Sequence, residues 1–140
     1  TLRDFSRAMN DQSITLGIAP ADPSYLENVY RTNVASAYGA GRWTQMNDPD
    51  VIDARPYRQW FTARDNRVRA EHAPMESVVW RADNPAFAVL APPAGFQCRC
   101  AIVTVSQEEF DDEGLAKDFV ESIPAGFVMT PGFGASSFVR

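Results

Sequence analysis

Residues that commonly build catalytic sites are scarce in this chain of 140 residues, which contains one histidine and two cysteines. It has no glycine-rich phosphate loop, and no pair of carboxylates stands at the spacing of a general acid and a general base. These absences argue against phosphate chemistry and against acid–base catalysis. We therefore expect a protein that is not an enzyme and that has no small-molecule substrate.

Long apolar runs are also missing. No stretch approaches the roughly 18 consecutive apolar residues of a membrane-spanning helix, and the N-terminal residues lack the basic and then apolar layout of a signal peptide. Hydrophobic residues make up 45% of the chain, which is enough for one core at this length. We therefore expect one soluble, intracellular domain without a membrane contact.

Lysine is nearly absent, because Lys117 is the only lysine among the 13 basic residues. Arginine favours forked hydrogen bonding to carboxylates or phosphates over diffuse attraction. The net charge of −5 argues against a dedicated sequence-reading DNA-binding domain. Arg67 and Arg69 could nevertheless face a phosphate backbone, or they could pair with nearby acidic residues and order a turn.

Hydrophobic spacing predicts helices in the first third of the chain. One is expected over residues 2–16, and a second begins at Ser24, where Ser24 and Glu27 fit a capping box. A short third helix follows Asp48-Pro49. The second helix should carry a buried stripe with an asparagine in its middle, formed by Leu26, Val29, Tyr30, Asn33, Ala37 and Tyr38.

Aromatic and β-branched runs predict three short strands, at residues 57–63, 78–80 and 101–105. Together these patterns predict an α+β fold in which N-terminal helices pack on a small antiparallel sheet. We assign residues 1–122 to a single domain and residues 123–140 to an extended tail rich in glycine and proline.

The two cysteines, Cys98 and Cys100, are separated only by Arg99. A disulfide between them would close a strained ring, and a redox role would need a different spacing or a positioned base. Metal ligation is the third possibility, with His72 as a further ligand and Asp65 as the fourth. The alternative is that the cysteines are small buried hydrophobic residues and that His72 is structural. The residues alone leave these last two interpretations equally open.

Several stretches in a fixed order resemble the phage Mu protein F-like family of head morphogenesis proteins. The resemblance covers about residues 25–106, and the most specific stretches are DNRVRAEH at 65–72, WRAD at 80–83 and PPAGFQCRC at 92–100. Residues that depart from the usual family pattern are Val68, Ala70, Glu76 and Gln97. None of these positions is a candidate ligand.

The resemblance implies a minor structural protein of the head of a tailed double-stranded DNA phage or prophage, which acts in capsid morphogenesis near the portal. Its expected partners are the portal and capsid proteins and packaged DNA, in the host cytoplasm during assembly and then in the virion. The family's acidic residue, histidine and paired cysteines fall on Asp65, His72, Cys98 and Cys100, and its arginines fall on Arg67 and Arg69.

A site shared by those four residues would hold a structural zinc ion that ties a loop to the start of a strand. With four protein ligands, no coordination position would remain for an activated water. The rival hypothesis is a toxin-like enzyme that cleaves or modifies nucleic acid through His72.

Overall fold

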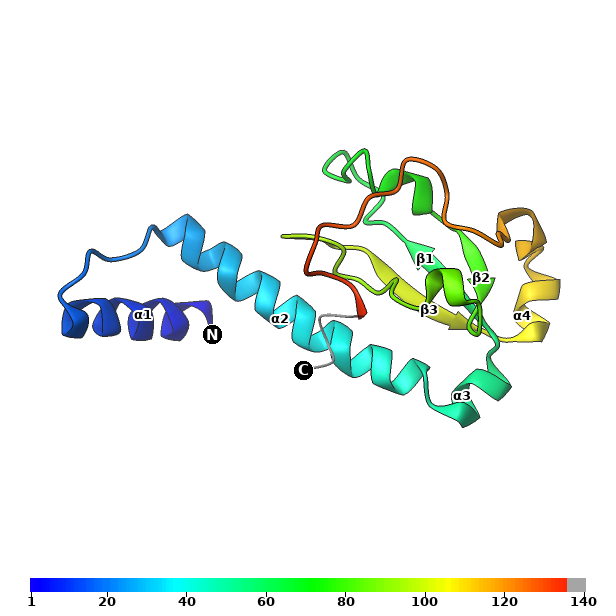
Figure 1. The fold of residues 1–140 in the computed structure, drawn as a ribbon, viewed down its shortest axis with the longest axis horizontal. Coiled ribbons are helices and arrows are strands. Elements are labelled where there is room, and N and C mark those ends of the chain that lie inside the picture. The colour runs from blue at the N-terminus through cyan, green and yellow to red at the C-terminus, as the bar shows by residue number, and fades with distance from the viewer. Residues whose placement is uncertain (136–140) are drawn as a thin grey trace.

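The computed structural model describes residues 1–135 of the chain, in which helices precede a small sheet (Figure 1). The helices and strands are α1 (Leu2–Leu16), α2 (Pro23–Met46), α3 (Pro49–Ala54), β1 (Tyr57–Phe61), β2 (Val79–Arg81), β3 (Ala101–Val105) and α4 (Gln107–Asp112). Short 3-10 helices precede β2 and β3 and follow α4. The α+β class and the antiparallel sheet predicted from the sequence are confirmed.

Helix α1 and the first half of α2 form an arm that extends away from the sheet, and the second half of α2 runs beside the sheet (Figure 1). A capping box between Thr1 and Asp4 starts α1. Helix α2 is capped by Asp22, whose side chain accepts hydrogen bonds from the next turn, with Pro23 at the first helical position. The predicted cap at Ser24 is therefore wrong, because Asp22 already satisfies these backbone N–H groups. The rings of Phe5 and Tyr30 pack between the helices, with centroids 5.6 Å apart.

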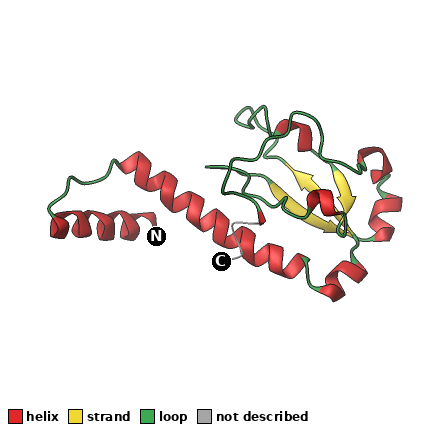
Figure 2. Ribbon diagram, in the orientation of Figure 1, coloured by secondary structure: helices red, strands yellow, loops and turns green. Residues whose placement is uncertain are grey.

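The buried stripe predicted on α2 is wrong beyond its first turn. Leu26 and Met46 are the buried residues of this helix. Asn33 is exposed, and Tyr38 is 70% exposed. The physical reason is that much of α2 belongs to the arm, where the sheet does not cover it (Figure 2).

The sheet has the order β2-β1-β3, with antiparallel pairing throughout. Side chains alternate between its faces. Trp60 and Trp80 lie in a core on one face, and Tyr57 and Val79 lie in a second core on the other face. Both faces are therefore covered. The guanidinium of Arg42 on α2 donates to the carbonyl oxygen of Ile102 in β3 at 2.6 Å, which fastens the second half of α2 to the sheet.

The tail packs against its own domain as far as it is described. The amide of Val120 donates to the carbonyl of Val79 at 2.9 Å, and the chain then runs as an extended segment past the loops before β2 and β3. Its amides at 128, 130 and 135 donate to the carbonyls of Glu71, Ala94 and Val89. The predicted tail residues 136–140 lie outside the described residues.

Candidate metal site

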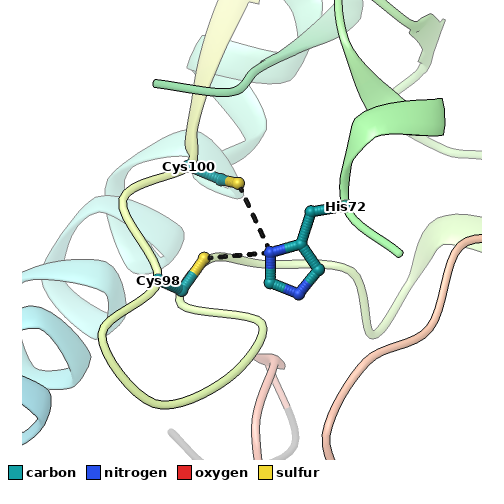
Figure 3. Close-up of side chains that lie close together, drawn as sticks. All are labelled: His72, Cys98 and Cys100. Atoms are coloured by element: carbon teal, nitrogen blue, oxygen red, sulfur yellow. Dashed lines mark hydrogen bonds between the residues drawn. The ribbon is translucent and has the colours of Figure 1, made fainter. Parts of the chain in front are cut away.

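Three side chains meet where the loop after β1 crosses the segment that leads into β3. Nδ1 of His72 lies 3.8 Å from Sγ of Cys98 and 3.8 Å from Sγ of Cys100 (Figure 3). All three donor atoms lie within 4.8 Å of one another. A tetrahedral zinc ion has zinc–sulfur distances of about 2.3 Å and zinc–nitrogen distances of about 2.0–2.1 Å, so its donors stand about 3.6–3.8 Å apart. The observed spacing fits such an ion.

His72 is placed by a tight turn in the backbone. Its amide donates to the carbonyl of Arg69 at 3.0 Å, and its own carbonyl accepts from the amide of Met75 at 3.1 Å, where a 3-10 helix begins. The ring is 3% exposed, and the ring of Phe127 lies over it at a centroid distance of 6.0 Å. The tail thus shields the imidazole from solvent. Nε2, the nitrogen that faces away from the thiols, has no hydrogen-bond partner among the described residues.

The two cysteines sit on a loop with little room. Residue Gln97, just before Cys98, has a left-handed backbone with φ of 53°. A Cβ on Gly95 would lie 2.4 Å from Nη1 of Arg69 and 2.8 Å from Oγ1 of Thr130, so these side chains would have to shift to admit it. Arg69 itself donates from Nη2 to the carbonyl oxygen of Phe96 at 2.5 Å. The loop shape is therefore set by close contact with the segment that carries His72.

The two thiols influence each other's ionisation. Hydrogen bonding to Cys100 lowers the pKa of Cys98, against the opposing effect of burial. The same contact, together with burial, raises the pKa of Cys100. The pair therefore loses its first proton more easily than an ordinary thiol does, and a thiolate is the form of cysteine that binds metals.

Trp60 adds a further polar group beside the sulfurs. Its indole is fully buried, and its Nε1–H has no hydrogen-bond partner of standard geometry within the described part of the chain. The contact with Cys98 and burial raise the pKa of Cys100, and the nearby Trp60 indole opposes part of that rise. An N–H beside a sulfur favours the thiolate over the thiol. The donor set of one imidazole and two thiolates suits zinc.

Asp65, the fourth ligand expected from the sequence, is not part of this group. Arg99 donates to both of its carboxylate oxygens, at 2.6 Å and 2.8 Å. The structure therefore brings together three of the four predicted ligands. Sequence reasoning missed the roles of Arg99 and Trp60, although the arginine between the cysteines was a visible signal of a charged partner nearby.

The two arginines predicted to contact phosphate have different surroundings. Arg69 donates a hydrogen bond to the carbonyl oxygen of Phe96 in the cysteine loop. The side chain of Arg67 is instead 76% exposed, and its Nη2 lies 3.7 Å from Oδ2 of Asp65. Arg67 is therefore the more available of the two for an outside group.

Comparison with known proteins assigns the family. The family model described as Phage Mu protein F like protein matches residues 1–103. The chain belongs to this family. The matched range contains His72, Cys98 and Cys100, whereas the Phe127 ring that covers His72 lies beyond it. No solved structure matches the chain.

Two curated relatives of this Mu F-like chain carry related names. One, capsid assembly protein F of Escherichia phage Mu, is 35% identical over 106 residues, which cover 76% of this chain and 23% of that protein. The other, the Mu-like prophage FluMu F protein of Haemophilus influenzae, is 31% identical over 106 residues, which cover 76% of this chain and 24% of that protein. The chain thus spans about a quarter of the length of each relative.

Among the described residues, no helix is both long enough and apolar enough to cross a membrane.

Proposed function

We propose that this chain is a minor structural component of the head of a tailed double-stranded DNA phage or prophage, and that it acts in capsid morphogenesis near the portal. The observation that carries the proposal is family membership over residues 1–103. The capsid assembly name of the phage Mu relative supports it. On this proposal the chain is found in the host cytoplasm during assembly and in the virion afterwards.

The partners that we propose are the portal and capsid proteins, and the arm offers them a surface. Several large apolar side chains stand exposed on α1, α2 and the connection between them: Ile14 (73%), Leu16 (62%), Ile18 (59%), Tyr25 (61%) and Val34 (52%). A contiguous apolar surface on this arm would suit the binding of another protein. Packaged DNA is a further proposed partner, through the exposed guanidinium of Arg67.

We further propose that the domain holds a structural zinc ion through His72, Cys98 and Cys100. The ion would tie the loop after β1 to the start of β3, two segments that are 26 to 28 residues apart. A sheet of three short strands gives limited stability by itself, and metal binding free energy adds to the free energy of folding. This argument favours a stabilising role for the ion.

The test of the zinc site is elemental analysis of protein purified without added metal, combined with thermal melting. We expect about one zinc ion per chain, and a clearly lower melting temperature for the Cys98→Ser, Cys100→Ser double variant. Treatment with a chelator should lower the melting temperature of the wild type and leave that of the double variant nearly unchanged. Zinc-free wild-type protein that melts together with the double variant would refute the site.

The test of the assembly role uses particles of the parent phage or prophage. We expect the protein to co-purify with heads, and electron microscopy of labelled particles to locate it near the portal vertex. Head formation that proceeds normally without the protein, and particles that lack it, would contradict the proposal.

The rival enzyme hypothesis gains little support from the geometry. General acid–base catalysis on nucleic acid needs a histidine that reaches the substrate, yet His72 is 3% exposed and its Nδ1 faces two thiols. A cleavage assay that compares the wild type with His72→Ala would decide the question. Activity lost in the variant would revive the enzyme hypothesis, whereas equal background activity would end it.

A further inference from the structure

The candidate site supplies three donors where zinc usually has four. Within residues 1–135, the ligand group consists of His72, Cys98 and Cys100 alone. The remaining residues, Ser-Ser-Phe-Val-Arg at 136–140, include no histidine, cysteine, aspartate or glutamate. Closed structural zinc sites have four protein ligands, whereas sites with three protein ligands keep one position for an exchangeable group. Among the described residues, the donor count therefore separates this site from the closed type.

Asp65, the carboxylate expected from the sequence to be the fourth ligand, already has other partners. Both oxygens of Asp65 accept from Arg99, and Oδ1 also accepts from the amide of Arg67 at 3.0 Å. For Asp65 to reach a metal, these bonds would have to break, including the hydrogen bonds to Arg99 that strongly lower the pKa of the carboxyl group. In this fold the carboxylate of Asp65 therefore binds Arg99 and the backbone amide of Arg67 and does not point at the thiols.

Open space lies beside the two thiols. A cavity of about 140 Å³ lies between α2 and the segment 91–102, and both Cys98 and Cys100 line it. Its other walls are mostly apolar and include Gly39, Met46 and Pro93. Both cysteines are only half-buried. The cavity therefore gives a small molecule space next to the two cysteines.

This inference rests on the proposed zinc site. We propose that the chain holds zinc with three ligands and that the fourth coordination position takes an exchangeable donor from solution. The ligand class is a small nitrogen, oxygen or sulfur donor, with water bound when no stronger donor is present. The position is thus a binding site for an external ligand, and Asp65 does not fill it.

The experiment uses the full 140-residue chain with cobalt(II) in place of zinc, because cobalt has visible absorption bands that report its ligands. Azide and imidazole are the two added donors. We expect saturable shifts of the cobalt ligand-field bands with each donor, while the thiolate-to-cobalt charge-transfer band persists. Persistence of that band shows that the added donor has not displaced the cysteines.

Asp65→Asn is the matched variant. If the fourth position is open in the wild type, azide should shift the cobalt bands of the two proteins similarly once both are saturated with cobalt, because Asp65→Asn is expected to weaken metal binding without changing the donor set. If Asp65 is the fourth ligand, the wild type should resist azide and the variant should respond, which would overturn the inference.

Two failures are distinguishable. Cobalt that binds with a thiolate band but ignores both donors at high concentration would overturn the open position and leave the zinc site standing. A chain that binds neither cobalt nor zinc would overturn the zinc site itself, and with it the open position.

Discussion

Arg99, the residue between the two cysteines, donates two hydrogen bonds to the carboxylate of Asp65, one from each terminal nitrogen. Nη1 donates to Oδ2 at 2.6 Å, and Nη2 donates to Oδ1 at 2.8 Å. Asp65 lies in the loop that leads to His72, so this paired contact joins the two segments whose side chains meet at the candidate site. It holds the thiols in front of the imidazole. Asp65 is thus a positioning residue for the site.

Asp65→Asn should weaken zinc binding without changing its stoichiometry. The loss of the paired contact frees the cysteine loop, and changes to groups that orient metal ligands typically cost about tenfold or more in affinity. We expect about one zinc ion per chain, with an affinity about tenfold lower in competition with a chromophoric chelator.

The matched control is Asp83→Asn, which removes a similar paired contact from Arg81 to Asp83, at 3.0 Å for each bond, away from the site. It should bind zinc as the wild type does. Equal zinc affinity in Asp65→Asn and the wild type would show that the contact between Arg99 and Asp65 is not needed to position the cysteine loop.

The sequence indicated which residues could form the site, because the order of the stretches at 65–72 and 92–100 carried the family resemblance. It could not indicate where Asp65 points. An aspartate is equally suited to a metal ion and to an arginine, and Arg99 lies 34 residues away in the chain. Only the fold brings the two together.

The strands were predictable for a local reason, since β-branched and aromatic runs suit a sheet with both faces covered. The burial of α2 was not predictable in the same way. Its apolar spacing extends through Tyr38, yet Tyr38 is 70% exposed, because burial depends on what lies opposite a residue.

Gly95→Ala should destabilise the domain. Its Cβ would collide with the guanidinium of Arg69 and the hydroxyl of Thr130, and overpacking of this kind typically costs about 1–3 kcal/mol. Gly41→Ala is the matched control, because nothing lies within 4 Å of a Cβ there and the residue is inside α2. It should stabilise the chain by up to about 1 kcal/mol.

Chemical denaturation of both glycine variants measures these free energies of unfolding. A Gly95→Ala protein as stable as the wild type would mean that Arg69 moves aside at no cost. Its contact with the carbonyl of Phe96 would then contribute nothing to the loop.

Glu76 should make stability depend on acid pH. Burial opposes its ionisation, but hydrogen bonds from Thr62 at 2.8 Å and 2.5 Å, with others from Arg64 and Ser77, lower its pKa below the usual 4.5. The folded state therefore holds fewer protons than the unfolded state, so this contribution is present above the usual pKa and is lost as pH falls through the lowered one.

Glu76→Gln should consequently lose less stability than the wild type between about pH 5 and pH 3. The measurement is the free energy of unfolding at a series of pH values. Glu121→Gln, at an exposed position, should follow the wild-type curve. If the free energy of unfolding of Glu76→Gln falls with pH in parallel with that of the wild type, Glu76 does not contribute to the acid sensitivity of the domain.

Arg58 is a buried charge without a carboxylate partner among the described residues, and it should be strongly stabilising. It is 3% exposed and donates to three backbone carbonyls: those of Met46 at the end of α2, Arg55 at 2.9 Å and Tyr57 at 3.0 Å. Burial, followed by the charge of Arg55, lowers the pKa of Arg58. The carbonyls at the end of a helix favour a cation, which offsets part of the cost of burial.

Arg58→Met keeps a similar length of apolar side chain but removes every donor, so these carbonyls lose their partner inside the protein. We expect a loss of roughly 3 kcal/mol in the free energy of unfolding. The control is Arg31→Met, whose side chain is 64% exposed and pairs with Glu27, and it should change stability by less than about 1 kcal/mol. Equal denaturation midpoints for the two variants would show that water replaces the guanidinium of Arg58 without loss, and that α2 is fastened to the sheet by Arg42 and Met46 instead.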